Sequence, residues 1–273
     1  MTEDVWGIPY PLRVPNIDAN VANIARAWNY MVGGKDNFEA DREAARQLIA
    51  AAPVISVAAP ASRAFLRRAV AYLVGEVGIR QFLDIGTGLP TAGNTHEIAQ
   101  SLAPDCRVVY VDNDPVVISH VRTLVTPFPE GFTSYIDADA RDPDMIVARA
   151  SKTLDFAKPI AVMMFDLLNF IADDAVAASV VSQVLAAVPA GSYLAIMHPA
   201  SDLEPALLEA ERRWNQLAAT QVRLRSREEV AGFFTGLRLV APGLVTVPEW
   251  RPASDEAVPE EMIPLYAAVA RKP

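Results

Sequence analysis

The sequence has little of the chemistry that builds disulfides or metal centres. Its 273 residues include one cysteine, Cys106, and three histidines. A single thiol forms no internal disulfide, and without a second cysteine nearby it builds no thiolate metal site. We interpret Cys106 as a small residue at a strand edge. The histidines do not cluster with acids at ligand spacing, so we predict no metal.

Long hydrophobic runs are also missing. The apolar stretch IAVMMFDLLNFIA (160–172) is interrupted by Asp and Asn, and it falls short of the roughly 20 residues that a membrane span needs. The first residues, MTEDVWGIPYPLRVPN, have neither a basic start nor an apolar signal core. We therefore expect no membrane span and no export, and a cytoplasmic protein.

Positive charge is not in excess. The formal net charge is −9, which repels a phosphate backbone, so nucleic acid is not an expected partner. A local basic patch of Arg223, Arg225 and Arg227 is interpreted as a solvated helix face or loop. With 52% hydrophobic residues, the chain can bury the core of one large domain with an extension.

The N-terminal part of the chain has helical periodicity. Gly33 ends the first pattern as a helix C-cap glycine would, and the second helix begins near Asp36 or Asn37, either of which can cap it. We expect the first helix over 18–32, the second from Asp36 or Asn37 to just before Pro53, and a third over 61–76. Together they form a predicted helical extension or lid, residues 1–78.

From residue 79 onward, strand and helix patterns alternate. Apolar runs typical of buried strands lie at 80–85, 107–112, 133–138, 159–168 and 191–198. This alternation predicts a doubly wound α/β fold with a Rossmann-like, mostly parallel sheet. Two late strands, in LRLVAPGLVTVPEW and PLYAAVARK, complete the core of 79–273, and one is expected to be antiparallel. Ser226 and Glu229 have the spacing of a helix capping box.

Glycine is scarce, with 13 in the chain, yet Gly86, Gly88 and Gly93 all fall in DIGTGLPTAGN after the first strand. Glycine at such a turn lets the backbone approach a ligand, and the next helix adds its positive end. The third glycine comes too late for the dinucleotide fingerprint, which disfavours a nicotinamide oxidoreductase, the less favoured alternative. Asp84, two residues before Gly86, suits a ligand that carries an ammonium group.

Acids follow the next two strands. Asp112 lies 24 residues beyond Gly88, where a carboxylate can accept both hydroxyl hydrogens of a ribose. Asp139 can accept from an adenine amino group while the N–H of Ala140 meets a ring nitrogen. Three neighbouring aspartates are interpreted as turn or cap residues: Asp114, Asp137 and Asp142. Acids at three consecutive strand ends predict an adenosine ligand with an amino acid tail, S-adenosylmethionine.

Several segments, taken in order, resemble a large bacterial family of S-adenosylmethionine-dependent methyltransferases whose substrates are mostly unknown. They are NYMVGGKDNFEADRE, FLDIGTGLPTAGNTHEIAQ, VVYVDNDPVV, YIDADARDP, and WRP with a terminal VARKP. The similarity covers about 17–273. It implies a class I methyltransferase sheet and, by motif position, cofactor contacts at Asp84, Gly86, Gly88, Asp112, Asn113 and Asp139. Thr87, between the two glycines, joins these candidates.

The resemblance implies methyl transfer to an unidentified small molecule but names no substrate. Members of the family often read VLHF at the fourth strand, where this chain has LLNF with Asn169, and asparagine is no general base. A catalytically inactive cofactor-binding or regulatory protein is therefore an alternative. Absence of a base does not exclude transfer, because holding the reactants in line supplies much of the rate. The oligomeric state is open, with a homodimer as one option.

Two side chains at strand ends are candidates for acid–base work, Asp166 and His198. Asp166 is equally a candidate contact for the cofactor or the substrate, and His198 for the substrate. Each also has a structural reading, as a buried hydrogen-bonded acid and as a satisfied strand-end histidine. His96 and His120 are interpreted as structural or exposed.

The stretch GGKDN, residues 33–37, joins the first two predicted helices. Gly33 and Gly34 can adopt positive φ, and Lys35 adds a cation beside a helix N-terminus, which together would receive a carboxylate. We predict a lid over the glycine turn, with Gly34 and Lys35 near the methionine carboxylate and Tyr30 as a wall.

Overall fold

The computed structural model describes residues 17–89, 93–117, 132–218, 220–253 and 262–273. Its first half contains α1 (Ile24–Met31), α2 (Glu39–Ala51), α3 (Ile55–Ala71), the π-helical turn η1 (Tyr72–Glu76), β1 (Gln81–Ile85), α4 (Thr95–Leu102), β2 (Arg107–Asp112) and β3 (Phe132–Asp137). Its second half contains α6 (Pro143–Ala150), β4 (Ala161–Phe165), η2 (Leu168–Phe170), α7 (Asp174–Ala187), β5 (Tyr193–Pro199), α8 (Pro205–Leu217), α9 (Arg227–Gly232), β6 (Arg238–Leu239), β7 (Val245–Thr246), η3 (Val247–Glu249) and β8 (Leu265–Arg271).

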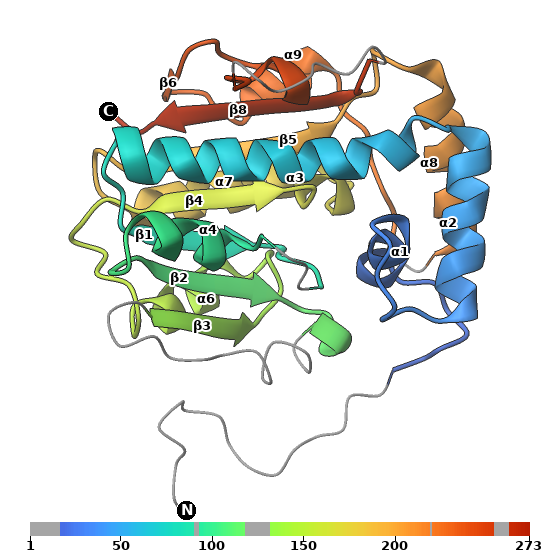
Figure 1. Cartoon of the computed structure of the whole chain (residues 1–273), viewed down its shortest axis with the longest axis horizontal. Coiled ribbons are helices and arrows are strands. Elements are labelled where there is room, and N and C mark those ends of the chain that lie inside the picture. The colour runs from blue at the N-terminus through green and yellow to red at the C-terminus, as the bar shows by residue number, and fades with distance from the viewer. Residues whose placement is uncertain (1–16, 90–92, 118–131, 219, 254–261) are drawn as a thin grey trace, which may run out of the picture.

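The strands form one sheet in the order β3-β2-β1-β4-β5-β8-β6, with β7 also pairing with β8 (Figure 1). Strands β1 to β5 are parallel, and β8 pairs antiparallel with β5 from Tyr193↔Arg271 to Pro199↔Leu265. The predicted doubly wound, mostly parallel sheet with an antiparallel late strand is thereby confirmed. The strand order reverses between β1 and β4, and ligands of such sheets bind beyond the strand ends at that switch point.

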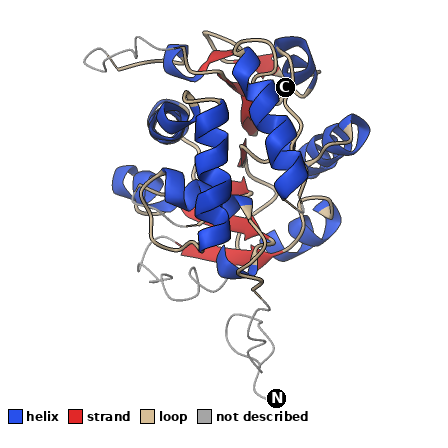
Figure 2. Ribbon diagram, turned by 90° about the vertical axis from the view of Figure 1, so that its right-hand side faces the viewer, coloured by secondary structure: helices blue, strands red, loops and turns tan. Residues whose placement is uncertain are grey.

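Three helices lie beyond the carboxyl ends of the parallel strands (Figures 1 and 2). Helices α1, α2 and α8 share a hydrophobic cluster of their own, which includes Leu48, Leu207 and Trp214. A buried ion pair, Arg26 Nε to Asp41 Oδ2 at 2.9 Å, ties α1 to α2. We call this group of three helices the helical cap. The helical cap lies over the carboxyl ends of the strands, where the switch point is.

Helix α2 leaves the cap and meets α3 at a sharp bend. Pro53 lies in the break, and the axes of α2 and the joined α3 and η1 differ by 101°. In the described residues no single helix is long and apolar enough to cross a membrane. The bent pair of α2 with α3 and η1 has the length and composition of a membrane span, but only when the two parts are counted together. Helix α3 lies within the predicted extension, yet it packs on the sheet and not in the cap.

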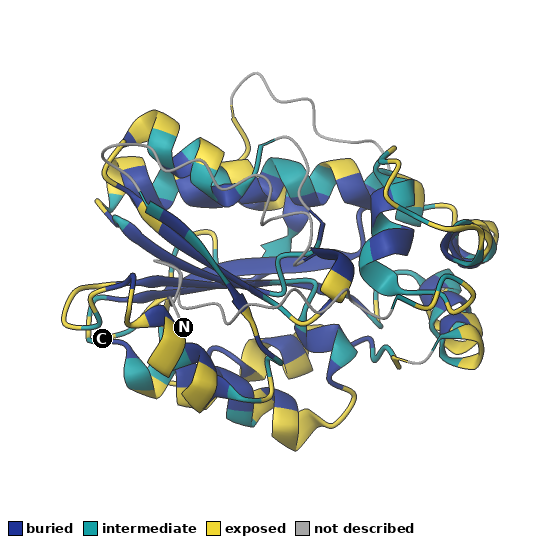
Figure 3. Cartoon of the chain, turned by 90° about the horizontal axis from the view of Figure 1, so that it is seen from below, coloured by how far each residue is buried: buried dark blue, intermediate teal, exposed yellow. Residues whose placement is uncertain are grey.

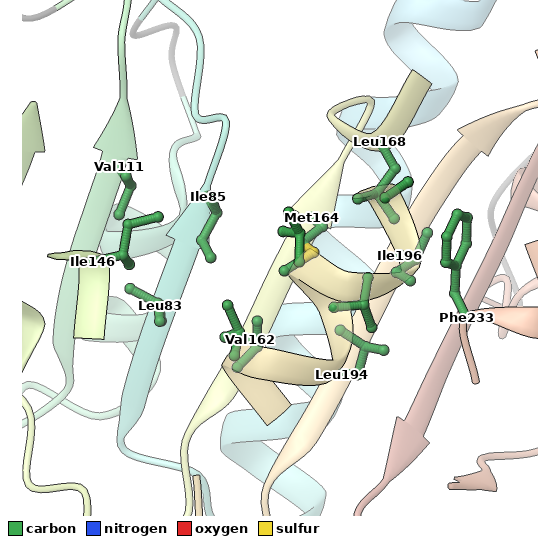
Figure 4. Close-up of a cluster of buried hydrophobic side chains, with 14 of the residues drawn as sticks. Leu83, Ile85, Val111, Ile146, Val162, Met164, Leu168, Leu194, Ile196 and Phe233 are labelled. Atoms are coloured by element: carbon green, nitrogen blue, oxygen red, sulfur yellow. The ribbon is translucent and has the colours of Figure 1, made fainter. Parts of the chain in front are cut away.

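Alternate side chains of each strand point to opposite faces, and helices cover both (Figure 3). One face packs against α3, α4 and η1, with Phe65, Phe82 and Met163 among its buried residues. The other packs against α6, α7 and α9. Figure 4 shows part of that second face: Leu83, Ile85, Val111, Ile146, Val162, Met164, Leu168, Leu194, Ile196 and Phe233. Both faces are apolar, so polar side chains concentrate at the strand ends.

Several element bounds differ from the sequence prediction for local reasons. Helix α1 begins at Ile24 and not near residue 18, because the Asn23 side chain caps it by accepting from Ala25 N at 2.8 Å. Helix α2 begins after Phe38 and not at Asp36 or Asn37. The Asp41 carboxylate accepts from Phe38 N at 2.8 Å and so fixes that start. The Ser226–Glu229 capping box is present as predicted.

Candidate functional site

A cavity of about 830 Å³ lies between the carboxyl ends of the parallel strands and the helical cap. The turns after β1, β2, β3 and β4 line one part of it. Residues of α1, α3 and α8, the ends of β5 and β8, and residues 220–222 and Leu224 line much of the rest. Its volume is in the upper part of the range of roughly 300–1,000 Å³ for small-molecule sites.

The turn after β1 depends on Gly86. Its φ of +79° lies in the left-handed region, and its N–H donates to Val111 O at 2.8 Å. A Cβ at this position would lie 2.7 Å from Leu167 Cδ1, so the turn after β4 approaches too closely for any side chain. Gly88 also has positive φ, +65°, but a Cβ there would meet open space. With Thr87 between them, these glycines expose main chain to the cavity.

Asp84 lies at the base of this turn and is only 8% exposed. Its Oδ2 accepts from Thr95 Oγ1 at 2.7 Å. Burial raises the pKa of Asp84 to about 6, while the Thr95 hydrogen bond and the Arg63 guanidinium act in the opposite direction. Arg63, on α3, donates to Gly93 O at 2.6 Å and lines the same part of the cavity. The sequence prediction missed Arg63 because no local motif distinguishes it within a helix.

Asp112 ends β2 and is held by main-chain donors. Its Oδ2 accepts from Gly88 N at 2.8 Å and its Oδ1 from Asp114 N at 2.9 Å. Burial raises the pKa of this carboxyl, against the effect of those hydrogen bonds. The N–H of Asn113 also contributes a hydrogen bond to this carboxylate, which has about four acceptor sites and so keeps capacity for a further donor. Asp114 in turn accepts from Val116 N at 2.7 Å, which confirms its reading as a turn or cap residue.

The turn after β3 brings Asp139, Ala140 and Arg141 to the cavity, where Asn113 of the preceding turn also lies. Asp139 accepts from Arg141 Nε at 2.9 Å, and this pairing holds the pKa of the carboxyl below its usual value. Asp142 caps α6 by accepting from Met145 N at 3.1 Å, as predicted.

The turn after β4 carries two polar side chains that line the cavity, Asp166 and Asn169. Strand β4 stops at Phe165, earlier than predicted, because Asp166 adopts a φ of +49° and donates its N–H to Met197 O at 3.0 Å. Burial raises the pKa of Asp166 to about 7. In the described part of the chain, neither Asp166 Oδ1 nor Asn169 Oδ1, both buried, has a hydrogen-bond partner.

Replacing Asp166 by asparagine is expected to stabilise the protein above neutral pH. Between an unfolded pKa near 3.8 and a folded pKa of about 7, the folded state binds more protons, so wild-type stability falls as pH rises through this window. At 1.36 kcal/mol per pKa unit, the full difference between the folded and unfolded pKa values limits this loss of stability to about 4 kcal/mol. Because the side chain is partly exposed, we expect about 1–3 kcal/mol at pH 8 and no difference below about pH 4.

Urea unfolding of both proteins across this pH range checks the prediction. Eight other charged residues line the same cavity: Arg63, Asp84, Asp112, Asp114, Asp139, Arg141, Asp173 and Glu211. They are present in both proteins, so the difference between the two isolates Asp166. A stability difference that stays constant with pH would contradict the assigned shift.

Arg225 is not solvated, contrary to the sequence interpretation. It is 1% exposed and donates to Leu168 O at 2.7 Å and to Ile171 O at 2.8 Å, so it holds the main chain of η2 and the residue after it. Arg225 is not a lining residue of the cavity. Its Nε also donates to Asp174 Oδ1 at 3.1 Å. Arg223 behaves as expected of an exposed residue and pairs with Asp174 at 2.8 Å. The sequence prediction missed Arg225 because RLR alternation does not say which side chain turns inward.

The structure does not bring His198 to the cavity. The ring is fully buried, and Nδ1 contacts Pro199 O at 2.9 Å. A carbonyl only accepts, so Nδ1 carries the proton and Nε2 accepts from Arg225 at 3.0 Å. Burial is the main cause that lowers the pKa of His198 to about 3. This histidine is neutral and its lone pair is engaged, so we do not propose it as a base.

Asn29 holds the GGKDN turn. Gly33 has the predicted positive φ, +83°, but Gly34 does not. Glycine is required at position 34 because a Cβ there would overlap the side-chain amide of Asn29. Asn29 Oδ1 accepts from Asp36 N at 2.9 Å. Lys35 is exposed. Three candidates, Tyr30, Gly34 and Lys35, are not among the cavity-lining residues, and Trp28, Met31 and Val32 of this region line it instead.

The remaining histidine and cysteine predictions concern structural roles. His96 Nδ1 contacts Oη of the cavity-lining Tyr110 at 2.9 Å, but His96 itself is not a lining residue. His120 lies outside the described residues. Cys106 is free and buried immediately before β2, and burial raises the pKa of its thiol to about 11. Within the described ranges, no group of three or more His, Cys, Asp or Glu could hold a metal ion.

Comparisons with known proteins agree with this geometry. A family model described as S-adenosyl methyltransferase matches residues 12–273. A DUF574 family protein from Streptomyces avermitilis is 42% identical, with a TM-score of 0.89, over 94% of this chain and 99% of its own. A proposed methyltransferase from Thermobifida fusca is 36% identical, with a TM-score of 0.87, over 98% and 99%. No protein with a curated description matches significantly. The chain belongs to the S-adenosyl methyltransferase family, and its cofactor is S-adenosylmethionine.

Proposed function

We propose that this protein transfers the methyl group of S-adenosylmethionine to a small molecule bound in the same cavity. One observation carries the proposal: a single cavity joins the glycine turn and the acidic strand ends of a class I methyltransferase sheet to an apolar surface under the helical cap. When bound, S-adenosylmethionine supplies a sulfonium-activated methyl group. The chain supplies position and shielding from water, which account for much of the rate in such transfers.

The charge of the lining fits this cofactor. The described residues that line the cavity include two arginines, Arg63 and Arg141, and seven acids: Asp84, Asp112, Asp114, Asp139, Asp166, Asp173 and Glu211. An acidic lining favours a ligand that carries sulfonium and ammonium charges. It disfavours the pyrophosphate of a nicotinamide dinucleotide. The charged residues that line the cavity therefore do not support the oxidoreductase alternative.

Individual residues fit the parts of the cofactor. Asp112 keeps acceptor capacity for the ribose hydroxyls, and its hydrogen bonds from Gly88 N and Asp114 N keep it in place. Asp139 and the N–H of Ala140 lie beyond it for the adenine edge. Asp84, with Gly86 and Thr87 above it, is the candidate for the amino acid tail. We propose these roles from position and donor chemistry.

The helical cap provides most of the acceptor surface. Trp28 and Met31 of α1 and Leu207 and Trp214 of α8 line the cavity, and Leu66 of α3, outside the cap, lines it beside them. Their apolar side chains would exclude water from the reacting groups and select a substrate with an apolar body.

Replacing Asp112 by alanine is expected to weaken S-adenosylmethionine binding about 100-fold. Two charge-assisted hydrogen bonds of about 1.5 kcal/mol each account for that loss. Isothermal titration calorimetry measures it. The matched control is Asp137→Ala, because Asp137 pairs in register with Asp112 at the end of β3 but is exposed and outside the cavity lining. Asp112→Asn, which preserves shape, tests whether any loss reflects folding.

Unaltered affinity in the Asp112→Ala variant would refute the cofactor placement. Catalysis is tested separately, by incubating the protein with S-adenosylmethionine and a set of apolar alcohols, phenols and amines, and detecting methylated products by mass spectrometry. Tight cofactor binding without transfer to any of them would favour a binding or regulatory role.

A further inference from the structure

Two side-chain oxygens in the turn after β4 are buried without a partner, and both belong to residues that line the cavity. They are Oδ1 of Asp166 and Oδ1 of Asn169. In the described part of the chain no donor reaches either atom. An unpaired buried acceptor costs roughly 1–3 kcal/mol, and each one in a native structure requires an explanation. Such a pair is explained by a ligand that donates hydrogen bonds to it.

The backbone also indicates a binding role for this turn. Asp166 is one of two described non-glycine residues with positive φ. That conformation costs about 1–2 kcal/mol for a residue with a side chain. Glycine would avoid the cost, so the carboxylate is retained at the expense of strain, as is common at ligand-binding positions.

Two residues that do not line the cavity, Arg223 and Arg225, hold the main chain of this turn. Arg225 donates to Leu168 O and Ile171 O on either side of Asn169, and Arg223 N donates to Asn169 O at 2.8 Å. The main chain of η2 is thus satisfied by residues that follow α8. The Asp166 and Asn169 side chains are left for the cavity.

The position of this turn in the sheet places it on the acceptor half of the site. The cofactor candidates Asp84, Asp112 and Asp139 follow β1, β2 and β3, which form one half of the sheet. Asp166 N donates to Met197 O of β5, on the other side of the switch point. The lining around that second half is mainly apolar: Met197, Pro199, Leu207, Trp214, Leu224, Pro264 and Leu265.

We propose that Asp166 and Asn169 together recognise the methyl acceptor, and that this acceptor is an apolar molecule with one hydroxyl or amino group that donates hydrogen bonds to them. The apolar body packs under α8 and the donor group meets the turn after β4. The inference rests on the proposed function, since it assigns the acceptor half of that site.

Binding of three matched probes in the presence of saturating S-adenosylhomocysteine tests the inference. The probes are 2-naphthol, 1-naphthylmethylamine and 2-methoxynaphthalene, which shares the apolar body but donates no hydrogen bond. Naphthalene fluorescence reports each dissociation constant. We expect the better of the two donor probes to bind at least about 10-fold more tightly than the ether, since one unpaired buried acceptor costs that much. Which donor binds better distinguishes hydroxyl from amine acceptors.

Three variants separate recognition from folding. Asp166→Gly relieves the positive φ while removing the carboxylate, so we expect a fold at least as stable as wild type and a loss of preference for the donor probes. Asn169→Ala should reduce the same preference. Asp173→Asn removes a charge from the same lining but keeps the α7 cap that Asp173 provides, and the preference should persist.

The outcomes are distinguishable from failure of the proposed function. S-adenosylhomocysteine should bind wild type and the Asp166→Gly variant with dissociation constants within about 3-fold of each other, because the carboxylate lies on the acceptor half. Equal binding of the ether and the donor probes, failure of every probe to bind, or an intact preference in Asp166→Gly would overturn the inference. Failure of wild type to bind S-adenosylhomocysteine would instead count against the cofactor site itself.

Discussion

Replacement of Gly86 by alanine is expected to lower the free energy of unfolding by about 2–5 kcal/mol and to raise the dissociation constant of S-adenosylmethionine about 10–100-fold. Two costs add. A φ of +79° is unfavourable for any residue with a Cβ, by about 1–2 kcal/mol. The new Cβ would also lie 2.7 Å from Leu167 Cδ1 and 3.0 Å from Leu167 Cβ, and overpacking of this kind costs a further 1–3 kcal/mol.

The binding loss follows because relief of the contact moves one of two turns that line the cavity. Chemical denaturation gives the stability change and calorimetry gives the affinity. Gly236→Ala is the matched control: its φ is +80°, and a Cβ at this position would have no described atom within 4 Å. It should show the backbone cost alone and normal cofactor affinity. Equal effects of the two substitutions would show that the Leu167 approach is unimportant.

Replacement of Arg225 by leucine is expected to cost about 3–5 kcal/mol of stability. The side chain is 1% exposed, and its loss leaves the carbonyls of Leu168 and Ile171 and the Nε2 of His198 without their donor. Each unpaired buried group costs roughly 1–3 kcal/mol, less whatever water or rearrangement restores. Surviving folded protein should bind the naphthalene donor probes more weakly, because η2 loses its support.

Arg223→Leu is the control for the loss of a charge beside Asp174. Arg223 is 38% exposed and its ion pairs with Asp174 and Glu229 lie at the surface, so the expected cost is below about 1 kcal/mol. Arg225→Lys should recover only part of the stability, since an ammonium cannot reach two carbonyls as the planar guanidinium does. A leucine variant as stable as wild type would mean that water replaces the guanidinium.

The sheet and one half of the site were predictable from the sequence because their signals are local. Apolar runs that alternate with amphipathic segments specify parallel strands, and DIGTG specifies a glycine turn whose φ values only glycine adopts easily. Asp84, Asp112 and Asp139 each follow a predicted strand directly. Parallel pairing then brings those ends together, and all three acids line the cavity.

The other half depends on contacts between distant segments, which leave no local pattern. Arg225 becomes a core residue only because the loop before α9 crosses η2, so its spacing with Arg223 predicted a solvated surface. His198 ends β5 as expected, yet its ring is on the Arg225 side and away from the cavity. Lys35 looked suited to a carboxylate by charge, but Asn29 folds the GGKDN turn on itself and leaves Lys35 exposed.

The helical cap is assembled from two parts of the chain that are far apart, α1 and α2 near the start and α8 late in the sequence. The turns that suit the cofactor come from neither part. A substitution in α8 can therefore reshape the acceptor surface while the glycine turn and the ends of β1, β2 and β3 stay unchanged. Such separation would let relatives of this protein diverge in substrate by exchange of cap residues while a common methyl donor is retained.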